Sequence, residues 1–325
     1  IFFCLWIPKA MREKLAMLRR FKNAWMFAGR GISTDSLQIK RRYELDGFCF
    51  PLEFFPEQLF RHEFLPRYEV FRSKCMQQQK WSDYRFKSHL FLPWLHDMLV
   101  KNDRLKDAAR ALLATDDVVI WSTDWCVKPR SSQHHFTWHQ DSTYSKFGAD
   151  GTTLWLAFSH VRRTSGPLLF RRSSHLLGQL QHMESEDESN LLAFGQYIPE
   201  FPDPEHKPAD YAHCTDGSTN WTSMEIVPAE LQPGQASAHN FLTIHSSAAN
   251  SDDADRVGLA VRIVRASAGI GRNDRVTHLC GSASAFEIEA PPTTEFGSRE
   301  LREWELSMER EKQMYFADHE RSNYK

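Results

Sequence analysis

The chain has 325 residues, 41% hydrophobic and 13% aromatic, which is enough apolar material for one large core and excludes a largely disordered protein. Its 40 Lys and Arg nearly balance 42 Asp and Glu, and no basic stripe interleaved with aromatic residues runs along it. We therefore expect a small-molecule partner and no nucleic acid. The six cysteines are scattered, without a C-x-x-C pair, as expected in the cytoplasm or another reducing compartment.

The amino-terminal segment begins with Ile1 and reads IFFCLWI before a basic stretch. We interpret this start as truncated upstream, which leaves an organelle-targeting signal as an open alternative. Seven apolar residues are too few to span a bilayer, which takes about 20, so we expect an amphipathic helix that packs on the core. Residues 1–42 are predicted to be an amino-terminal helical extension, and residues 43–325 a single domain of undetermined oligomeric state.

The pattern of apolar residues changes along the chain. Between residues 7 and 114 they recur at three- and four-residue spacing, which predicts helices. From Asp116 onward, short runs rich in β-branched and aromatic residues follow: DVVIWSTDWCVK, TTLWLAFSHV, GPLLFRR, SMEIVPAEL, ASAHNF and RVGLAVRIV. Turn residues rather than helices separate these runs. We predict a mainly β domain with α-helices, built on an antiparallel jelly-roll core over about residues 116–265.

Two segments depart from this pattern. Residues 181–222, acidic and rich in His and Pro, form a long insertion, for which a solvated loop is the default interpretation and a functional lid the alternative. After Ala266 we expect irregular chain, followed by a charged helical tail over about residues 298–320 that begins at Ser298.

A candidate metal site begins with the triplet His139-Gln140-Asp141, whose imidazole and carboxylate would point to one face of an extended strand. The triplet alone is weak, because a chain with 15 His and 42 acidic residues contains about two by chance. The other, His182-Met183-Glu184, we set aside. His245 lies among the later strands, and two imidazoles with one carboxylate form the facial triad of non-haem iron enzymes. We predict Fe(II) bound by His139, Asp141 and His245.

Among the remaining histidines, which we expect to be structural or exposed, His135 and His239 are the best candidates to contact the ligands. A 2-oxoglutarate co-substrate would also need a cation for its distal carboxylate, and arginine binds carboxylates as a bidentate fork. Arg256 heads the strand RVGLAVRIV after His245. Arg262 follows at an even offset, so both could face inward. Taken alone, Arg256 could equally be a surface charge near Asp252, Asp253 and Asp255.

Several blocks of the chain, in order, resemble the phytanoyl-CoA dioxygenase family, especially its bacterial-type branch, which also contains chlorinating enzymes. The blocks are YELDGFCFPL, KSHLFLPWL, WHQDSTY, TTLWLAFSHV and LQPGQASAHNFLTIHSSAANSDDADRVGLAVRIV, between about Tyr43 and Val264. The resemblance implies a double-stranded β-helix, a form of jelly roll. It implies that His139, Asp141 and His245 bind iron, that Arg256 binds 2-oxoglutarate, and that Trp155 and Ser247 lie near this co-substrate.

The reaction implied by the resemblance uses Fe(II), 2-oxoglutarate and O2 to hydroxylate an unactivated C–H bond, with release of succinate and carbon dioxide. Halogenases of the family replace the carboxylate ligand by a small residue, so Asp141 favours hydroxylation. The alternatives are a metal-binding jelly roll without oxidation, such as a cupin-like isomerase or a sensing module, and an interaction protein. The substrate implied is a small molecule or an acyl group carried by CoA or a carrier protein, and no catalytic residue beyond the metal ligands is predicted.

Overall fold

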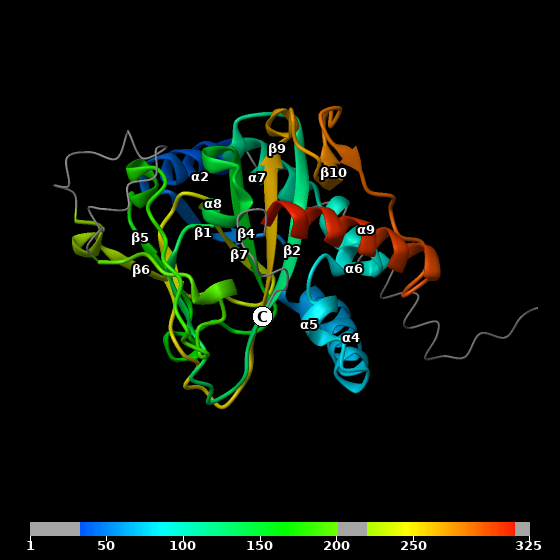
Figure 1. Cartoon of the computed structure of the whole chain (residues 1–325), viewed down its shortest axis with the longest axis horizontal. Helices are drawn as coiled ribbons and strands as arrows, with labels where there is room; N and C mark the ends of the chain where they lie inside the picture. The colour runs from blue at the N-terminus through cyan, green and yellow to red at the C-terminus, as the bar shows by residue number, and fades with distance from the viewer. Residues whose placement is uncertain (1–32, 201–219, 316–325) are drawn as a thin grey trace, which may run out of the picture.

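The computed structural model describes residues 33–200 and 220–315 (Figure 1). The predicted helix before residue 33 and part of the predicted lid therefore lie outside the described residues. The helices are α2 (Ser33–Asp46), α3 (Glu57–Leu59), α4 (Leu65–Gln77), α5 (Trp81–Tyr84), α6 (Pro93–Val100), α7 (Asp103–Leu113), α8 (Ser142–Ser145) and α9 (Ser298–Tyr315). The strands are β1 (Phe48–Glu53), β2 (Val118–Lys128), β3 (Phe136–His139), β4 (Gly151–Ala157), β5 (Leu168–Arg171), β6 (Ile226–Ala229), β7 (Gln235–Asn240), β8 (His245–Ser247), β9 (Arg256–Arg265), β10 (Arg275–Cys280) and β11 (Glu287–Ile288).

Two sheets form the centre of the fold. The larger has the strand order β1-β7-β4-β9-β2-β10-β11 and the smaller has the order β3-β8-β5-β6. Neighbouring strands are antiparallel except for β10 and β11. Apolar side chains of both sheets share one cluster, in which Phe48 of β1 stacks on Phe170 of β5 with ring centroids 4.7 Å apart. The sheets therefore pack together through a common core.

Helices cover the opposite face of the larger sheet. In α7, the buried residues recur at three- and four-residue spacing, and the helix begins where the Asn102 side chain accepts a hydrogen bond from the backbone N–H of Leu105. Leu105 and Leu113 of α7 share the largest core cluster with Leu154 of β4 and Val261 of β9. Burial of each such side chain contributes about 1.5–3 kcal/mol. This packing fixes one face of the sheet and leaves the other face to build a site.

The predicted strands are confirmed, and the fold mixes these large sheets with helices near both ends of the described chain. The expectation of irregular chain after Ala266 is wrong, because β10 lies between β2 and β11 in the larger sheet. The solvated-loop interpretation is wrong for part of the insertion, since Leu192, Phe194 and Ile198 are buried. In the described part of the chain, no helix is apolar over a length that would cross a bilayer.

Candidate metal centre

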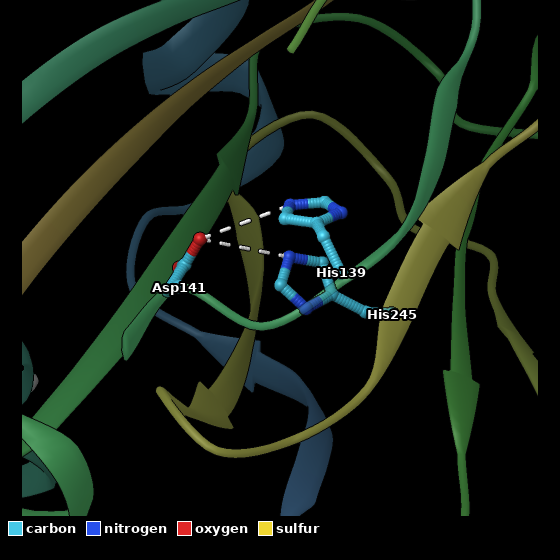
Figure 2. Close-up of side chains that lie close together, drawn as sticks. All are labelled: His139, Asp141 and His245. Atoms are coloured by element: carbon cyan, nitrogen blue, oxygen red, sulfur yellow. Dashed lines mark ion pairs between the residues drawn. The ribbon is translucent and has the colours of Figure 1, made fainter. Parts of the chain in front are cut away.

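His139 and His245 lie opposite each other on the antiparallel strands β3 and β8, with ring centroids 4.0 Å apart (Figure 2). The Nδ1 of His139 hydrogen-bonds the carbonyl of Thr137 at 2.8 Å, and the Nδ1 of His245 hydrogen-bonds the carbonyl of Thr243 at 2.9 Å. A carbonyl only accepts, so each ring carries its proton on Nδ1 and leaves the lone pair of Nε2 free for a metal. Both Nε2 atoms point toward Asp141.

The sequence predicted that Asp141 lies on the same strand as His139. In the structure it does not. Strand β3 ends at His139, and Asp141 has a helical backbone (φ −64°, ψ −25°) at the start of α8. The chain turns there because the N–H of Ser142 donates to the carbonyl of Phe241, outside the β3–β8 pairing. Even so, Asp141 Oδ1 lies 3.9 Å from His139 Nε2 and 3.8 Å from His245 Nε2.

The three ligand atoms all lie within 4.8 Å of one another, and all three side chains are buried. Metal–ligand bonds of about 2.1 Å bring neighbouring ligand atoms to roughly 3 Å from each other, so a small inward movement would let one ion contact all three. Two imidazoles and one carboxylate are also the donor set of a facial triad, which leaves coordination positions open. The residues present therefore fit a non-haem iron ion.

The protonation states of the cluster suit a metal. Burial would raise the pKa of Asp141, but the His239 ring, 3.4 Å from its carboxylate, and the positive charge of Arg262 hold that pKa well below its ordinary value. Burial lowers the pKa of both ligand histidines. At neutral pH the cluster thus offers two neutral imidazoles and one carboxylate, so a metal need displace no proton from it.

Polar side chains surround the Asp141 carboxylate. The hydroxyls of Tyr144 and Thr153 donate to its two oxygens, and His239 Nε2 lies 3.4 Å from Oδ2. His239 is thus one of the two histidines expected to contact the ligands, and it does. His135 does not, because its ring lies 3.4 Å from the carboxylate of Asp187 instead.

His182, from the triplet that we set aside, supports the metal centre without joining it. Its Nε2 accepts a 2.9 Å hydrogen bond from the backbone N–H of Gln140, and its Nδ1 hydrogen-bonds the carbonyl of Leu180. The side-chain amide of Gln140 donates to the carbonyls of Gly178 and Leu242. The residue between two of the ligands is therefore held on both its backbone and its side chain. No spacing in the sequence indicates this contact.

Arg256, Ser247 and Trp155 lie together. Arg256 is buried, and its Nη1 donates to Ser247 Oγ at 3.0 Å and to the carbonyl of Gly166 at 2.8 Å. Its guanidinium lies 5.0 Å from the centroid of the Trp155 ring. The alternative interpretation of Arg256 as a surface charge is wrong, and Asp255 pairs with Arg72 at 2.6 Å instead.

Lys128 is a buried lysine beside Arg256 that no motif in the sequence indicates. It pairs with Arg256 in the β2–β9 register, and its Nζ donates to Ser247 Oγ at 2.6 Å and to the Ser247 carbonyl at 2.7 Å. Burial and the neighbouring Arg256 lower the pKa of Lys128 to about 6, and burial lowers that of Arg256 to about 10. Within residues 33–200 and 220–315, no carboxylate forms an ion pair with either side chain. The buried guanidinium of Arg256, without a carboxylate partner among the described residues, therefore favours binding of an anion here.

One cavity, here called the central cavity, joins these parts. The three ligand residues, Arg256 and Trp155 all line it. Leu191, Leu192 and Ala193 of the insertion contribute apolar surface, and Glu311 contributes a carboxylate from α9. Arg262 also lines the cavity, which confirms that the two arginines of β9 face inward.

The cluster has the donor set of a facial-triad metal site, on a fold of two packed sheets. A sequence model of the phytanoyl-CoA dioxygenase family (PhyH) matches residues 54–258, and the chain belongs to this family. A search of curated protein sequences gives no match.

Solved structures share the fold. The non-haem monooxygenase ThoJ, in its apo form, is 20% identical with a TM-score of 0.67, and the alignment covers 86% of this chain and 98% of ThoJ. The ThoJ–Ni complex gives 20% identity and a TM-score of 0.63, covering 85% and 98% of the two chains. The epimerase SnoN in complex with Fe3+, alpha-ketoglutarate and nogalamycin RO is 16% identical with a TM-score of 0.53, covering 81% and 94%.

Proposed function

We propose that this protein is an Fe(II)- and 2-oxoglutarate-dependent dioxygenase that hydroxylates an unactivated C–H bond, releasing succinate and carbon dioxide. The observation that carries the proposal is the buried His139–Asp141–His245 cluster in one cavity with the unpaired cation Arg256. Membership of the phytanoyl-CoA dioxygenase family supports it. The two packed, mainly antiparallel sheets support a double-stranded β-helix as the finer description of the fold.

In this proposal, His139 and His245 bind the iron through Nε2, and Asp141 binds it through a carboxylate oxygen. When bound, iron supplies the activation of dioxygen that oxidation of a C–H bond requires. The protein's part is to hold the ligands. Backbone carbonyls fix the two imidazole rings, while Tyr144 and Thr153 hold the carboxylate by donating hydrogen bonds to it.

We propose that Arg256 binds the distal carboxylate of 2-oxoglutarate, with Ser247 as a hydrogen-bonding partner. The carboxylate would supply the negative charge that the buried guanidinium of Arg256 lacks among the described residues. Lys128 lies behind this corner of the cavity and supports it by donating a hydrogen bond to Ser247. Trp155 lies beside the guanidinium, so its ring keeps Arg256 oriented and excludes water from the carboxylate.

Hydroxylation is favoured over halogenation because Asp141 supplies the carboxylate that halogenases of the family replace. The epimerase SnoN has a similar fold, so the product must be identified to separate hydroxylation from other oxidative outcomes. We place the protein in the cytoplasm or another reducing compartment. The free thiols of Cys49, Cys75, Cys126 and Cys280 support this assignment.

The test starts from purified protein titrated with Fe(II) and 2-oxoglutarate without oxygen. We expect a visible absorption band that depends on both, and Asp141→Ala should need a higher Fe(II) concentration to give it, because one ligand is lost. With Arg256→Gln, the 2-oxoglutarate concentration needed should rise by roughly 10–100-fold, because a charged hydrogen-bonding partner is lost. With air, ascorbate and candidate substrates, succinate release should accompany a product one oxygen atom heavier. A metal-binding protein without oxidation would bind iron but give no band with 2-oxoglutarate.

A further inference from the structure

Arg262 lies on the inward face of β9 and lines the central cavity, as Arg256 does, but at a different place. Its Nε and Nη2 donate to the hydroxyl of Tyr144 at 3.2 and 3.0 Å. The Tyr144 hydroxyl in turn donates to Asp141. The head of Arg262 is therefore separated from the metal ligand by a single phenol group.

The charge of Arg262 has no anionic partner among the described residues. In the part of the chain that the structure describes, no carboxylate forms an ion pair with it. A phenol is a neutral partner, and a buried cation without an anion is costly. Arg262 keeps its charge all the same, because burial lowers its pKa but Tyr144, Asp141 and Asp124 together raise it well above the ordinary value.

The other carboxylates that line the cavity are engaged elsewhere. Asp124 accepts two hydrogen bonds from Arg85, at 2.8 and 2.9 Å. Glu311 accepts a 3.1 Å hydrogen bond from the Ser122 hydroxyl and lies 3.5 Å from Lys87 Nζ. Neither carboxylate is within ion-pair distance of Arg262. The positive charge that Arg262 presents to the cavity is therefore not neutralised by Asp124 or Glu311.

The proposed co-substrate does not neutralise Arg262. Along β9, six residues separate the two arginines, which places their Cα atoms about 20 Å apart at a rise of roughly 3.3 Å per residue. A five-carbon dicarboxylate held by Arg256 at one end and by the metal at the other has no carboxylate left for Arg262. The guanidinium of Arg262 thus remains available to the molecule that is oxidised.

We propose that Arg262 binds the carboxylate of the primary substrate and thereby selects small organic acids. This inference rests on the proposed function and names the substrate class of the same site. The apolar side chains of Leu191, Leu192 and Ala193 on the cavity wall suit an apolar body attached to that carboxylate. A free acid is favoured over its CoA or carrier thioester, because esterification removes the negative charge that Arg262 would bind.

The experiment compares matched compounds: octanoate, octanamide and octanoyl-CoA, and 3-phenylpropanoate with 3-phenylpropanamide. Succinate release and the shift of the anaerobic Fe(II)–2-oxoglutarate band are measured for each. We expect at least one acid to act at a concentration about ten times lower, or lower still, than its amide or thioester needs. Arg262→Gln should remove this preference. At saturating Fe(II), Arg262→Gln should still give a 2-oxoglutarate-dependent band, although its contact with Tyr144 can change the Fe(II) concentration needed.

Three further variants separate substrate binding from a structural role. Arg262→Lys keeps the charge and should keep a weaker preference for acids. Arg265→Gln changes an arginine of the same strand that pairs with Asp150 at 3.3 Å, and it should keep the full preference. If Arg262 acts only by holding Tyr144, then Tyr144→Phe and Arg262→Gln will change the Fe(II) band alike and neither will change the preference.

The inference is overturned if none of the acids acts, if amides or thioesters act equally well, or if Arg262→Gln still prefers acids. It is also overturned if that variant loses the band together with the preference, since the role is then structural. Absence of the band in the unaltered protein would instead refute the proposed function.

Discussion

His139 and His245 face each other across the paired strands β3 and β8, and each ring is held by the carbonyl of a threonine two residues earlier. The same hydrogen bond, from the histidine Nδ1 to the carbonyl two residues earlier, therefore occurs once at each of the two histidines. Because the strand pairing and the carbonyl contacts both belong to the protein, the two rings are oriented as Nε2 ligands before any metal binds.

The metal-free protein should lose stability as the pH falls below about 6.5. Burial lowers the pKa of His139, His245 and His182, the last to about 3. Below the ordinary pKa, the unfolded chain takes up protons that the folded chain does not, so each histidine costs up to about 1.4 kcal/mol per pH unit. Urea unfolding at pH 8, 6.5 and 5.5 would measure this. Equal stability at pH 6.5 and 5.5 would contradict it.

Replacing His182 should weaken metal binding although it is no ligand. His182→Ala leaves the backbone N–H of Gln140 without its acceptor, so the segment between His139 and Asp141 loses a support. Loss of such a contact typically lowers metal affinity by about 10–100-fold. Competition with a chelator would measure the affinity, and His62→Ala, a change in an exposed histidine, is the control. Equal affinities in the two variants would refute the supporting role.

The ligand set could be predicted from sequence because strands carry two of its members. The β-rich runs around His139 and His245 identify strands, and the family blocks give their order. The backbone of Asp141 could not be predicted, since the turn at Ser142 depends on a hydrogen bond to Phe241, 99 positions later in the sequence. Asp141 lies beside the two histidines, as expected, while its expected position on the strand was wrong.

Residues that act through tertiary contacts leave no local signal. The sequence indicates only that Lys128 ends a strand. The β2–β9 register is what places it beside Arg256. Strand β10 is defined by its pairing with β2 and β11 rather than by its own composition. Glu311 lies in a helix whose many charged residues suggest exposure to solvent. Its side chain nevertheless lines the central cavity.

Lys128 should make 2-oxoglutarate binding depend on pH. With a pKa of about 6, its amine is mostly neutral at pH 8, and a bound carboxylate nearby favours the charged form. Affinity should therefore fall as the pH rises from 6 to 8, by at most about tenfold per unit. Lys128→Met should bind more weakly at pH 6 and show a flatter profile. Anaerobic titration of the absorption band would measure both, and parallel profiles would contradict the assignment.

Lys87 should be essential for stability rather than for chemistry. Its buried Nζ lies 3.0 Å from Glu289 and 3.5 Å from Glu311, and it donates to the carbonyl of Arg275. Lys87→Met would leave two buried carboxylates without this cation, which should cost about 3–5 kcal/mol in the free energy of unfolding. Lys101→Met, which breaks an exposed ion pair with Asp97, should cost no more than about 1 kcal/mol.

A second variant tests whether the cost comes from the uncompensated carboxylates. Adding Glu289→Gln and Glu311→Gln to Lys87→Met removes both negative charges, so part of the lost stability should return, because an apolar or neutral replacement of a whole buried ion pair is often tolerated. Urea unfolding of the single and triple variants at pH 7.5 would measure the difference. A triple variant less stable than Lys87→Met would show that the two glutamates stabilise the fold through contacts other than Lys87, such as the hydrogen bonds that Glu289 accepts from Thr277 and Glu311 accepts from Ser122.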